Sequence, residues 1–541
     1  MNFSITCNLV DVHKRDIYPV ELKVANGVIV EIQRVERAER FLVPGFVDSH
    51  IHVESSMLLP SEFSRVAVMH GTVATVSDPH EIANVCGIAG VELMLRNAAQ
   101  VNFKFCFGAP ACVPATRFET TGAQLDQSKV AQLLKDERIG YLSEVMDFPG
   151  VLERSPEVMA KINKALSLGK PVDGHAPGLR GEDAAKYVQA GISTDHECCT
   201  KQEALEKLMA GCKIAIREGS AARNFDALES LIDEYPEMCM LCSDDKHPDE
   251  FLLGHINQLA ARAIAAGRDL MNVLDVACVN PVKHYGLDVG LLRTGDPADF
   301  IVVENLVDFQ LYQTYVNGQL VADRGKCLMP ICETETMNNF AAGPISIRQL
   351  ALSATATNVR VIEAIDGQLT TRGRIFQCRT EGGLAVSDIQ NDVLKIVVVN
   401  RYQPAEPAIA FVNGFGLKSG AIASSVAHDS HNIVAVGTND EDLLQAINAV
   451  ITSRGGLSVS SGNQTDVLPL PIGGLMSTEC CQTVAEQYGN LDERTRQLGS
   501  TLRAPFMTLS FMSLLVIPSL KLSDQGLFDV DQFEFVPLFV N

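Results

Sequence analysis

The sequence predicts an α/β fold: a (β/α)8 barrel with a small β-sandwich domain and a C-terminal α+β domain. Three observations predict it. Between about Phe41 and Cys278, eight short β-like runs alternate with helical segments. Polar residues follow many of these runs, at the strand ends where parallel barrels carry their chemistry. Strand and turn patterns lie immediately before and after this region.

The barrel prediction depends on the order of the β-like runs. They read GFVDSH, TVATVSDP, FKFCFGAP, GYLSEVMDF, PVDGHAP, ISTDHE, CKIAIREGS and MCMLCSDD. Helical segments lie between them, and two of these, SPEVMAKINKALSLG and KQEALEKLMAG, end in a glycine typical of a helix C-cap. Eight strand-then-helix units in succession are the pattern of a (β/α)8 barrel, which we place at residues 43–285.

The two flanks of the barrel predict one shared β domain. Residues 1–42 alternate in the manner of strands and contain a turn at Asn26 and Gly27. Residues 286–342 are again strand and turn, and VNGQLV is a hairpin signal. We expect both segments to pair in a small β-sandwich domain. Residues 343–541 mix strand-like runs such as DVLKIVVVN with helical ones such as EDLLQAINAVITSRGG, which predicts a C-terminal α+β domain.

The composition limits the classes of partner. The chain has 541 residues, too many for one core, and its 46% hydrophobic and 20% charged residues are typical of a well-packed protein. The net charge of −22 argues against broad contact with nucleic-acid phosphates, because such contact needs a basic face. This charge does not exclude a small, neutral heterocycle as substrate.

The cysteines and the apolar stretches predict a cytoplasmic protein. The start, MNFSITCNLVDVHKRD, lacks the pattern of a signal peptide, and LSFMSLLVIPSL is shorter than the roughly 18 residues of a membrane span. We therefore expect no membrane partner, and fifteen reduced cysteines that mostly pack in the core. Cys239 and Cys242 form a CxxC without a second pair at zinc-ribbon spacing, so we interpret it as structural.

The stretch VPGFVDSHIHVESS places alternating polar residues after an apolar run. If residues 46–52 form a strand, His50 and His52 share one face, with Asp48 and Glu54 on either side. A polar strand face at the surface would explain this pattern equally well on its own. The other strand ends decide between that explanation and a pair of metal ligands.

The predicted strand ends together supply four imidazoles and two carboxylates. In chain order these candidates are His50, His52, Glu144, His175, His196 and Asp244. At the rim of one barrel they can hold two divalent metal ions, with one carboxylate bridging the pair. A rim of buried, unpaired histidines would instead carry a desolvation cost that nothing offsets. We therefore predict a binuclear metal centre, although each histidine alone would be better explained as a core residue.

PGFVDSHIH resembles the first-strand signature of the amidohydrolase superfamily. More narrowly, HVESS, DPHEIANV, EVMDFPGV, DGHAPGL, DDKHPDE, SVAHDSHNI and LPLPIGGLMS are similar to segments of the bacterial adenine deaminase family, and they extend from about residue 44 to residue 476. The resemblance implies the same six ligands, with Mn²⁺ or Fe²⁺ as the two ions; the nitrogen and oxygen ligands also permit Zn²⁺. No lysine ends the fourth predicted strand, so the resemblance implies that Glu144 takes the place of the carbamylated lysine that bridges the metals in many relatives.

The resemblance further implies hydrolytic deamination of adenine to hypoxanthine and ammonia, a purine salvage reaction, by a metal-bridged hydroxide. Glu144 is our candidate for passing a proton to the ring nitrogen, and Asp244 for accepting the second water proton. Asp245 is the alternative to Asp244. We prefer Asp244 because it lies nearer the predicted strand, whereas Asp245 can pair with Lys246 or cap the next helix.

Six further residues are candidates for substrate binding: Glu54, His80, Glu81, His428, Asp429 and His431. Those in SDPHEIANV follow the second predicted strand, although acidic residues there can simply cap the next helix. The AHDSH segment belongs to the C-terminal domain. It is either a surface turn or a segment that closes over the barrel mouth, and the family resemblance favours the second alternative.

Two rival functions stay open. One is another amidohydrolase reaction, either hydrolysis of a cyclic amide or deamination of a different purine. The other is a barrel without activity that serves as a binding protein, which the complete ligand set disfavours. Chemistry of the cytidine-deaminase type is excluded, because no P-C-x-x-C motif occurs in the chain. We expect adenine as the small-molecule partner and a homodimer as the assembly.

Overall fold

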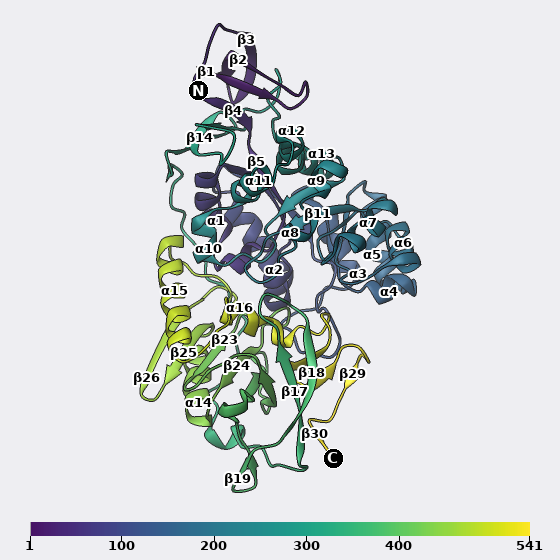
Figure 1. The fold of residues 1–541 in the computed structure, drawn as a ribbon, viewed down its shortest axis with the longest axis vertical. Coiled ribbons are helices and arrows are strands. Elements are labelled where there is room, and N and C mark those ends of the chain that lie inside the picture. The colour runs from purple at the N-terminus through teal and green to yellow at the C-terminus, as the bar shows by residue number, and fades with distance from the viewer. Residues whose placement is uncertain (1) are drawn as a thin grey trace.

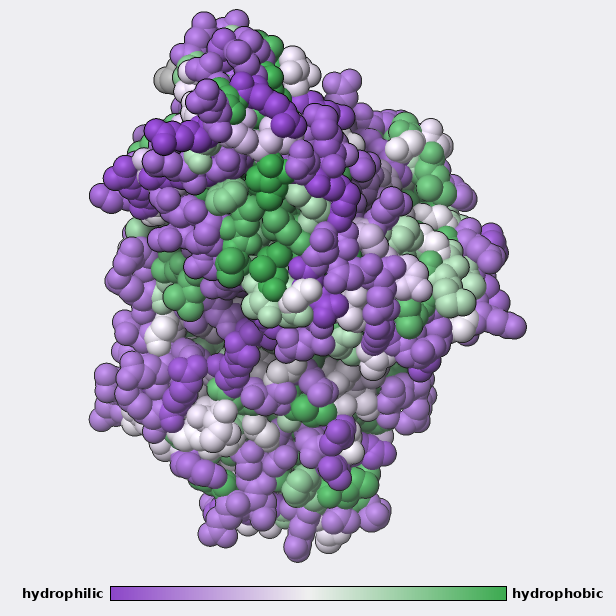
Figure 2. All heavy atoms as spheres, turned by 45° about the horizontal axis from the view of Figure 1, so that its top comes forward, coloured by the Kyte–Doolittle hydropathy of each residue, from purple (hydrophilic) through white to green (hydrophobic). Residues whose placement is uncertain are grey.

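The computed structural model describes residues 2–541 as three stacked parts (Figure 1). A β sheet that contains the N-terminal strands lies at the top, the barrel lies in the middle, and the C-terminal residues form the bottom. The visible surface is mostly hydrophilic, with one larger hydrophobic area near its middle (Figure 2). Among residues 2–541, no helix has both the length and the apolar character needed to cross a membrane.

Eight parallel strands form the barrel and are hydrogen-bonded in chain order. They are β5 (Phe46–Ile51), β6 (Thr72–Ser77), β7 (Lys104–Ala109), β8 (Ile139–Val145), β9 (Val172–Gly174), β10 (Thr194–Asp195), β11 (Lys213–Arg217) and β12 (Cys239–Cys242). The first and last strands meet where Asp244 N donates to His50 O at 3.0 Å and His52 N donates to Asp244 O at 3.3 Å. The barrel therefore closes at its polar rim, and the predicted fold class is confirmed.

Thirteen α-helices follow the barrel strands in the described chain. They are α1 (Pro60–Ala67), α2 (His80–Ala98), α3 (Gln127–Leu134), α4 (Phe148–Leu152), α5 (Pro156–Ser167), α6 (Gly181–Gln189), α7 (Lys201–Met209), α8 (Phe225–Leu228), α9 (Leu231–Glu234), α10 (Pro248–Leu253), α11 (Ile256–Ala265), α12 (Leu270–Leu274) and α13 (Asn280–Tyr285). The side chains of Asp126, Thr200 and Asp269 accept backbone N–H groups at the starts of α3, α7 and α12. The two glycine-terminated segments form α5 and α7, as predicted.

Strands from both flanks of the barrel form one eight-stranded sheet, in the order β16-β15-β14-β13-β4-β1-β2-β3. Their bounds are β1 (Asn2–Asp11), β2 (Asp16–Ala25), β3 (Val28–Arg34), β4 (Phe41–Pro44), β13 (Phe300–Val303), β14 (Leu311–Val316), β15 (Gln319–Asp323) and β16 (Lys326–Cys327). The Asn26-Gly27 turn joins β2 to β3 and lies against the turn at Asn317. A Cβ on Gly27, whose φ is +81°, would lie 2.7 Å from Asn317 O, so this position needs glycine.

The C-terminal residues form a nine-stranded sheet in the order β18-β17-β22-β21-β24-β23-β25-β26, with β30 paired to β17. Its strands are β17 (Asn358–Ala364), β18 (Thr371–Gln377), β21 (Leu394–Val399), β22 (Ala408–Asn413), β23 (Ala421–Ser424), β24 (Ile433–Gly437), β25 (Gly456–Ser461), β26 (Gln464–Pro469) and β30 (Phe539–Val540). Smaller sheets contain β19 (Thr380–Glu381), β20 (Leu384–Ala385), β27 (Leu520–Ser523), β28 (Gly526–Asp529) and β29 (Glu534–Phe535). The helices are α14 (Asp440–Thr452), α15 (Cys481–Gln497) and α16 (Pro505–Ser510).

The C-terminal part lies against the rim of the barrel. Ser477 N donates to Met57 O at 2.8 Å, and Asn432 Nδ2 donates to Thr120 O at 2.9 Å. Met57 and Thr120 belong to loops that follow β5 and β7. Because loops after parallel strands lie at the carboxyl ends of those strands, the C-terminal part covers the face of the barrel that carries the polar residues.

The LPLPIGGLMS segment makes a tight turn in this contact. Gly473 has a φ of +63°, and a side chain there would collide with Ile82 of α2. The fully buried guanidinium of Arg401 donates to Gly473 O and fixes the turn. Ile82 lies in the first turn of α2, so the glycine brings the C-terminal part close to the residues just after β6.

Candidate active site

His50 and His52, at the end of β5, face each other. Their Nε2 atoms are 3.3 Å apart, and both side chains are almost fully buried. Two facing ring nitrogens can share only one proton, and His50 Nδ1 has no hydrogen-bond partner. Ligand atoms about 2.1 Å from one ion lie about 3.0–3.4 Å from each other. The pair therefore fits a metal ion better than a hydrogen-bonded core.

Glu144, near the end of β8, lies between two groups of imidazoles. Its Oε1 lies 3.2 Å from His52 Nε2. Its Oε2 lies 2.8 Å from His175 Nδ1 and 3.3 Å from His196 Nε2. One oxygen thus faces the histidines of β5 and the other faces the histidines that follow β9 and β10. A carboxylate so placed fits the bridge of a centre that holds two divalent ions.

Asp244 follows β12 and faces the same histidines as Oε1 of Glu144. Its Oδ1 lies 3.5 Å from His50 Nε2 and 3.3 Å from His52 Nε2. Asp245 makes a different contact, because its Oδ1 accepts a hydrogen bond from Ser55 Oγ at 2.5 Å. It neither pairs with Lys246 nor caps α10, whose N-cap is His247. The geometry favours Asp244 as the ligand at this strand end.

The two carboxylates keep their charge despite burial. Burial by itself raises the pKa of Glu144, but His175 and the other imidazoles hold it well below its ordinary value. Burial likewise raises the pKa of Asp244, and the guanidinium of Arg217, together with His50 and His52, holds it well below its ordinary value. Ionised carboxylates are the form that binds a divalent cation. The electrostatics therefore agree with the geometry.

The sequence analysis missed two charged residues that contact the candidate ligands: Glu197 and Arg217. Arg217, the last residue of β11, donates through Nη1 to Asp244 Oδ2 at 2.7 Å and through Nη2 to Glu197 Oε2 at 2.8 Å. Glu197 Oε1 lies 3.5 Å from His175 Nδ1 and 3.4 Å from His196 Nε2. A charged residue near the end of a predicted strand was the available signal, since Glu197 ends the run ISTDHE and Arg217 lies near the end of the run CKIAIREGS.

Asp48 and Glu54, which alternate with the two histidines in sequence, have other contacts. His255 Nε2 lies 2.8 Å from Asp48 Oδ2, and Asp48 also accepts from Ser243 N at 3.1 Å. Glu54 Oε1 accepts the N–H of Ile82 at 3.2 Å, in the first turn of α2, and Glu54 does not line the cavity. The structure therefore does not bring Glu54 to the place expected for a substrate-binding residue. Its carboxylate instead accepts one of the backbone N–H groups that lack a partner within the helix at the start of α2.

His80 and Glu81 open α2 and connect the barrel cluster to the C-terminal part. His80 Nδ1 lies 3.0 Å from Asp78 Oδ2 and 3.4 Å from Glu144 Oε1. Glu81 contacts two histidines of the AHDSH segment: its Oε1 contacts His428 Nδ1, and its Oε2 lies 2.5 Å from His431 Nε2. His431 lies behind Glu81 and does not itself line the cavity.

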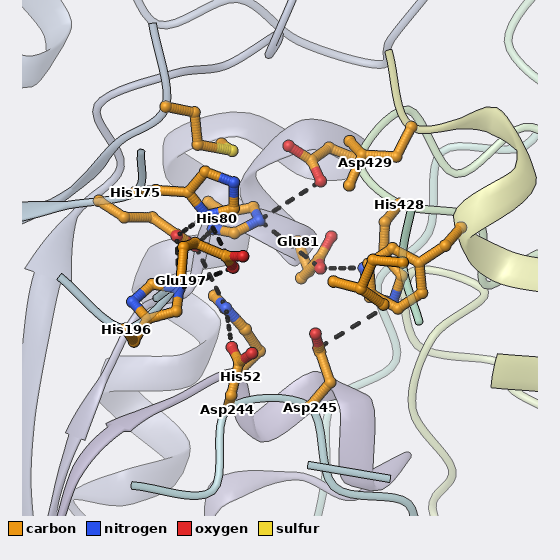
Figure 3. Close-up of a pocket in the computed structure, with 15 residues that line it drawn as sticks. His52, His80, Glu81, His175, His196, Glu197, Asp244, Asp245, His428 and Asp429 are labelled. Atoms are coloured by element: carbon orange, nitrogen blue, oxygen red, sulfur yellow. Dashed lines mark hydrogen bonds and ion pairs between the residues drawn. The ribbon is translucent and has the colours of Figure 1, made fainter. Parts of the chain in front are cut away.

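The AHDSH segment reaches the barrel rim, as the second of the two alternatives predicted. Figure 3 shows Asp429 and His428 on one side of a cavity and His175 and His196 on the other. Asp429 Oδ1 lies 3.7 Å from His80 Nε2. The residues that line this cavity are His52, His80, Glu81, Glu144, Met146, His175, His196, Glu197, Asp244, Asp245, Leu369, His428, Asp429, Phe511 and Leu514. Barrel and C-terminal residues thus enclose one site.

Two family models match this chain over most of its length. Residues 41–321 match the amidohydrolase family, and residues 368–534 match the adenine deaminase C-terminal domain. An adenine deaminase from Salinibacter ruber is 55% identical over 543 residues, which cover 100% of this chain and 99% of the relative. This chain belongs to the adenine deaminase family. The resemblance found in the sequence motifs is therefore confirmed.

Other members of the adenine deaminase family match this chain equally completely. An adenine deaminase from Sulfurovum sp. is 54% identical, with 98% of both chains covered. One from Methanosarcina mazei is 50% identical and covers 98% of this chain and 99% of its own length. The chain is therefore an amidohydrolase of this family, and its clustered His, Asp and Glu side chains form a candidate site for divalent metal ions.

Proposed function

We propose that this chain converts adenine and water to hypoxanthine and ammonia at a centre of two divalent metal ions. The names of its full-length relatives support the substrate and the reaction. One observation carries the two-ion centre: the oxygens of Glu144 face two separate groups of histidines. The cavity around this carboxylate suits a small substrate.

The candidate ligands divide into two sets that share Glu144. One ion would be held by Glu144 with His50, His52 and Asp244; the other would be held by Glu144 with His175 and His196. When bound, the ions act as Lewis acids and lower the pKa of a water molecule toward neutral. Nitrogen and oxygen ligands suit Mn²⁺ or Fe²⁺ and also permit Zn²⁺.

Asp244 is placed to move a proton between the attacking water and the leaving amine. Its Oδ1 faces the histidines of β5, while its Oδ2 accepts from Arg217 at 2.7 Å. Because its pKa is held well below the ordinary value, the carboxylate is ionised before the reaction and can accept a proton. It then returns the proton to the amine, which leaves as ammonia.

The proton that the purine ring nitrogen needs comes, in this proposal, from His428 rather than from Glu144, and the other proton of the attacking water restores the one that His428 gives up. Glu144 is the candidate bridge, with its two oxygens facing the two groups of histidines. His428 lines the cavity, its Nδ1 contacts Glu81, and its Nε2 has no hydrogen-bond partner. Burial lowers the pKa of His428, but Glu81 and Asp245 raise it to about 9, so the imidazolium is populated at neutral pH. This revises the role that the sequence suggested for Glu144.

Metal analysis combined with an ammonia assay tests the proposal. Protein expressed with manganese supplied and iron chelated should carry close to two ions per chain and release ammonia from adenine. A clean value of one ion with full activity would contradict the two-ion centre. Turnover of a cyclic amide or another purine base, without turnover of adenine, would support the rival amidohydrolase reaction. Two ions without any turnover would support the binding protein.

The location and the assembly are also proposals. We propose a cytoplasmic protein, because all fifteen cysteines, including Cys239 and Cys242, are free thiols, as expected in a reducing compartment. We propose a homodimer that contacts neither nucleic acid nor a membrane. Fractionation of cells and light scattering of the purified protein would test both.

A further inference from the structure

Three apolar side chains of the C-terminal part line the same cavity as the candidate ligands: Leu369, Phe511 and Leu514. We call them the roof. They belong to a small hydrophobic cluster that includes Ala221 and Ala222 of the loop after β11 and is separate from the main barrel core. The roof is therefore a distinct apolar contact between the C-terminal part and the barrel rim.

Phe511 gives the roof a flat surface. It begins a short 3-10 helix, Phe511–Ser513, directly after α16. Its ring stacks on the imidazole of His428, with centroids 4.4 Å apart and an angle of 21° between the planes. Among the described residues that line the cavity, it is the only phenylalanine, tyrosine or tryptophan. The site thus has one uncharged aromatic ring, stacked on His428, beside its ionisable groups.

Lys521, in β27, ties two roof segments together. Its side chain is fully buried, and Nζ donates to Leu369 O at 2.8 Å and to Phe511 O at 2.9 Å. Burial lowers the pKa of this amine to about 7, and no carboxylate of the described chain offsets the burial. A buried amine with only carbonyl partners disfavours folding relative to an apolar side chain. Through its two hydrogen bonds, Lys521 fixes the distance between the backbones of Leu369 and Phe511, which both line the site.

The roof faces the candidate ligands across one cavity of about 320 Å³. Leu369, Phe511 and Leu514 line this cavity from the C-terminal part, and the candidate ligands line it from the barrel. A purine held beside the candidate ligands would therefore lie against the roof.

We propose that Phe511 is the stacking surface for the purine ring, and that Lys521 is the positioning residue that holds Phe511 against it. The inference rests on the proposed function, since it takes a purine as the ligand. Stacking on an aromatic face depends on the flat ring and not on its substituents. Phe511 therefore acts on substrate and product alike, whereas the ionisable groups distinguish the reacting atoms.

The experiment separates binding from chemistry in the manganese-loaded protein. Phe511→Leu keeps an apolar side chain but removes the plane, and Phe511→Tyr keeps the plane. We expect Phe511→Leu to raise both the KM for adenine and the dissociation constant of hypoxanthine about tenfold or more. The value of kcat should change less than about threefold, two ions should stay bound, and Phe511→Tyr should bind hypoxanthine within about threefold of the unchanged protein.

Phe506→Leu is the matched control. Phe506 is buried in α16, packs near Tyr488 and does not line the cavity. We expect its hypoxanthine affinity within about twofold of the unchanged protein, because only general packing is altered. Unchanged hypoxanthine affinity in Phe511→Leu, or an equal loss in Phe506→Leu, would overturn the stacking role.

Lys521→Met tests the positioning role. Methionine has a similar length but no donor, and removal of a lone buried amine should not prevent folding. We expect about a threefold or greater rise in the dissociation constant of hypoxanthine. The double variant with Phe511→Leu should bind no more weakly than Phe511→Leu alone, because Lys521 acts through Phe511. Full additivity of the two losses, or no loss in Lys521→Met, would contradict the positioning role.

Calorimetric titration with hypoxanthine keeps this inference distinguishable from the proposed function. If the unchanged protein binds hypoxanthine but releases no ammonia from adenine, the proposed function fails while the Phe511 comparison still gives an answer. If the unchanged protein deaminates adenine and Phe511→Leu retains the same KM and the same hypoxanthine affinity, the inference fails while the proposed function stands. If hypoxanthine does not bind at all, the stacking role is wrong.

Discussion

The two sides of the cavity are built in different ways. The barrel side takes its candidate ligands from the ends of strands in one parallel sheet, where neighbouring strands hold each other by backbone hydrogen bonds. The C-terminal side takes its lining residues from positions between Leu369 and Leu514, and holds them by stacking, by Lys521 and by the contact of His428 with Glu81. The first side is built on one sheet, and the second on loops and a short 3-10 helix.

This difference predicts a division of work between the two sides. Substitutions on the barrel side should change metal content and the chemical step together, because strand ends fix ligands and cannot adjust. Substitutions on the C-terminal side should leave the metals in place and change how substrate is held or protonated. The following variants test this division, from the largest expected effect to the smallest.

Glu144→Gln should have the largest effect. It keeps the shape of the side chain but removes the charge that faces both groups of histidines. We expect a loss in kcat on the order of a thousandfold or more, together with a metal content clearly below two ions per chain. Steady-state kinetics and metal analysis on the same preparation check this. Near-normal turnover would place the bridge at Asp78 or Glu81 instead.

Arg217→Lys should have the next largest effect. Lysine keeps the positive charge but cannot donate to Asp244 and Glu197 at once, as the fork of Arg217 does. Groups that orient metal ligands typically contribute about 10–100-fold, so we expect kcat to fall by that amount. The KM for adenine should change less than kcat. A fall in kcat that exceeds the change in KM separates an orienting role from a general loss of folding. Equal changes in kcat and in the fraction of folded protein would contradict it.

His428→Ala with His431→Ala tests the C-terminal side directly. Both histidines contact Glu81, and neither belongs to the candidate metal ligands. The double variant should keep two ions and lose at least about tenfold in kcat/KM for adenine. Metal content serves as the internal control. Unaltered kinetics would leave the AHDSH segment with a packing role only.

The pH dependence sharpens the same test. With a pKa of about 9, His428 is an imidazolium at neutral pH and loses its proton as the pH rises through that value. If this proton reaches the purine ring, kcat/KM should fall above about pH 9, by up to about tenfold per pH unit. His428→Gln should lack that decline. The raised pKa also stabilises the folded protein fully below about pH 6.5 and ceases to do so above about pH 9.

Glu54→Gln should have the smallest effect. The carboxylate accepts the N–H of Ile82, which an amide oxygen can also accept, and it does not line the cavity. We expect kcat and KM within about threefold of the unchanged protein, and a slightly altered thermal stability. A tenfold loss of kcat/KM would restore Glu54 as a substrate-binding candidate.

Much of the barrel side could be predicted from the sequence because its signals are local. A strand has a period of two residues, so GFVDSHIH by itself places His50 and His52 on one face. Eight strand-then-helix units then bring residues such as Glu144 and Asp244 to one rim, since every strand of a (β/α)8 barrel points the same way. The sequence alone thus determined the barrel and the six residues that its rim brings together.

Tertiary structure decided the rest, because it depends on contacts between residues far apart in the chain. Glu54 has the same local spacing as the histidines, yet its carboxylate caps α2. Polar residues follow many of the predicted strands, so the sequence position of Arg217 does not single it out. Only the closed barrel brings it between Glu197 and Asp244. Phe511 and Lys521 belong to an apolar stretch and a short strand that carry no pattern of a site. Stacking and buried hydrogen bonds have no sequence period, so only the packing of the C-terminal part on the barrel could place them.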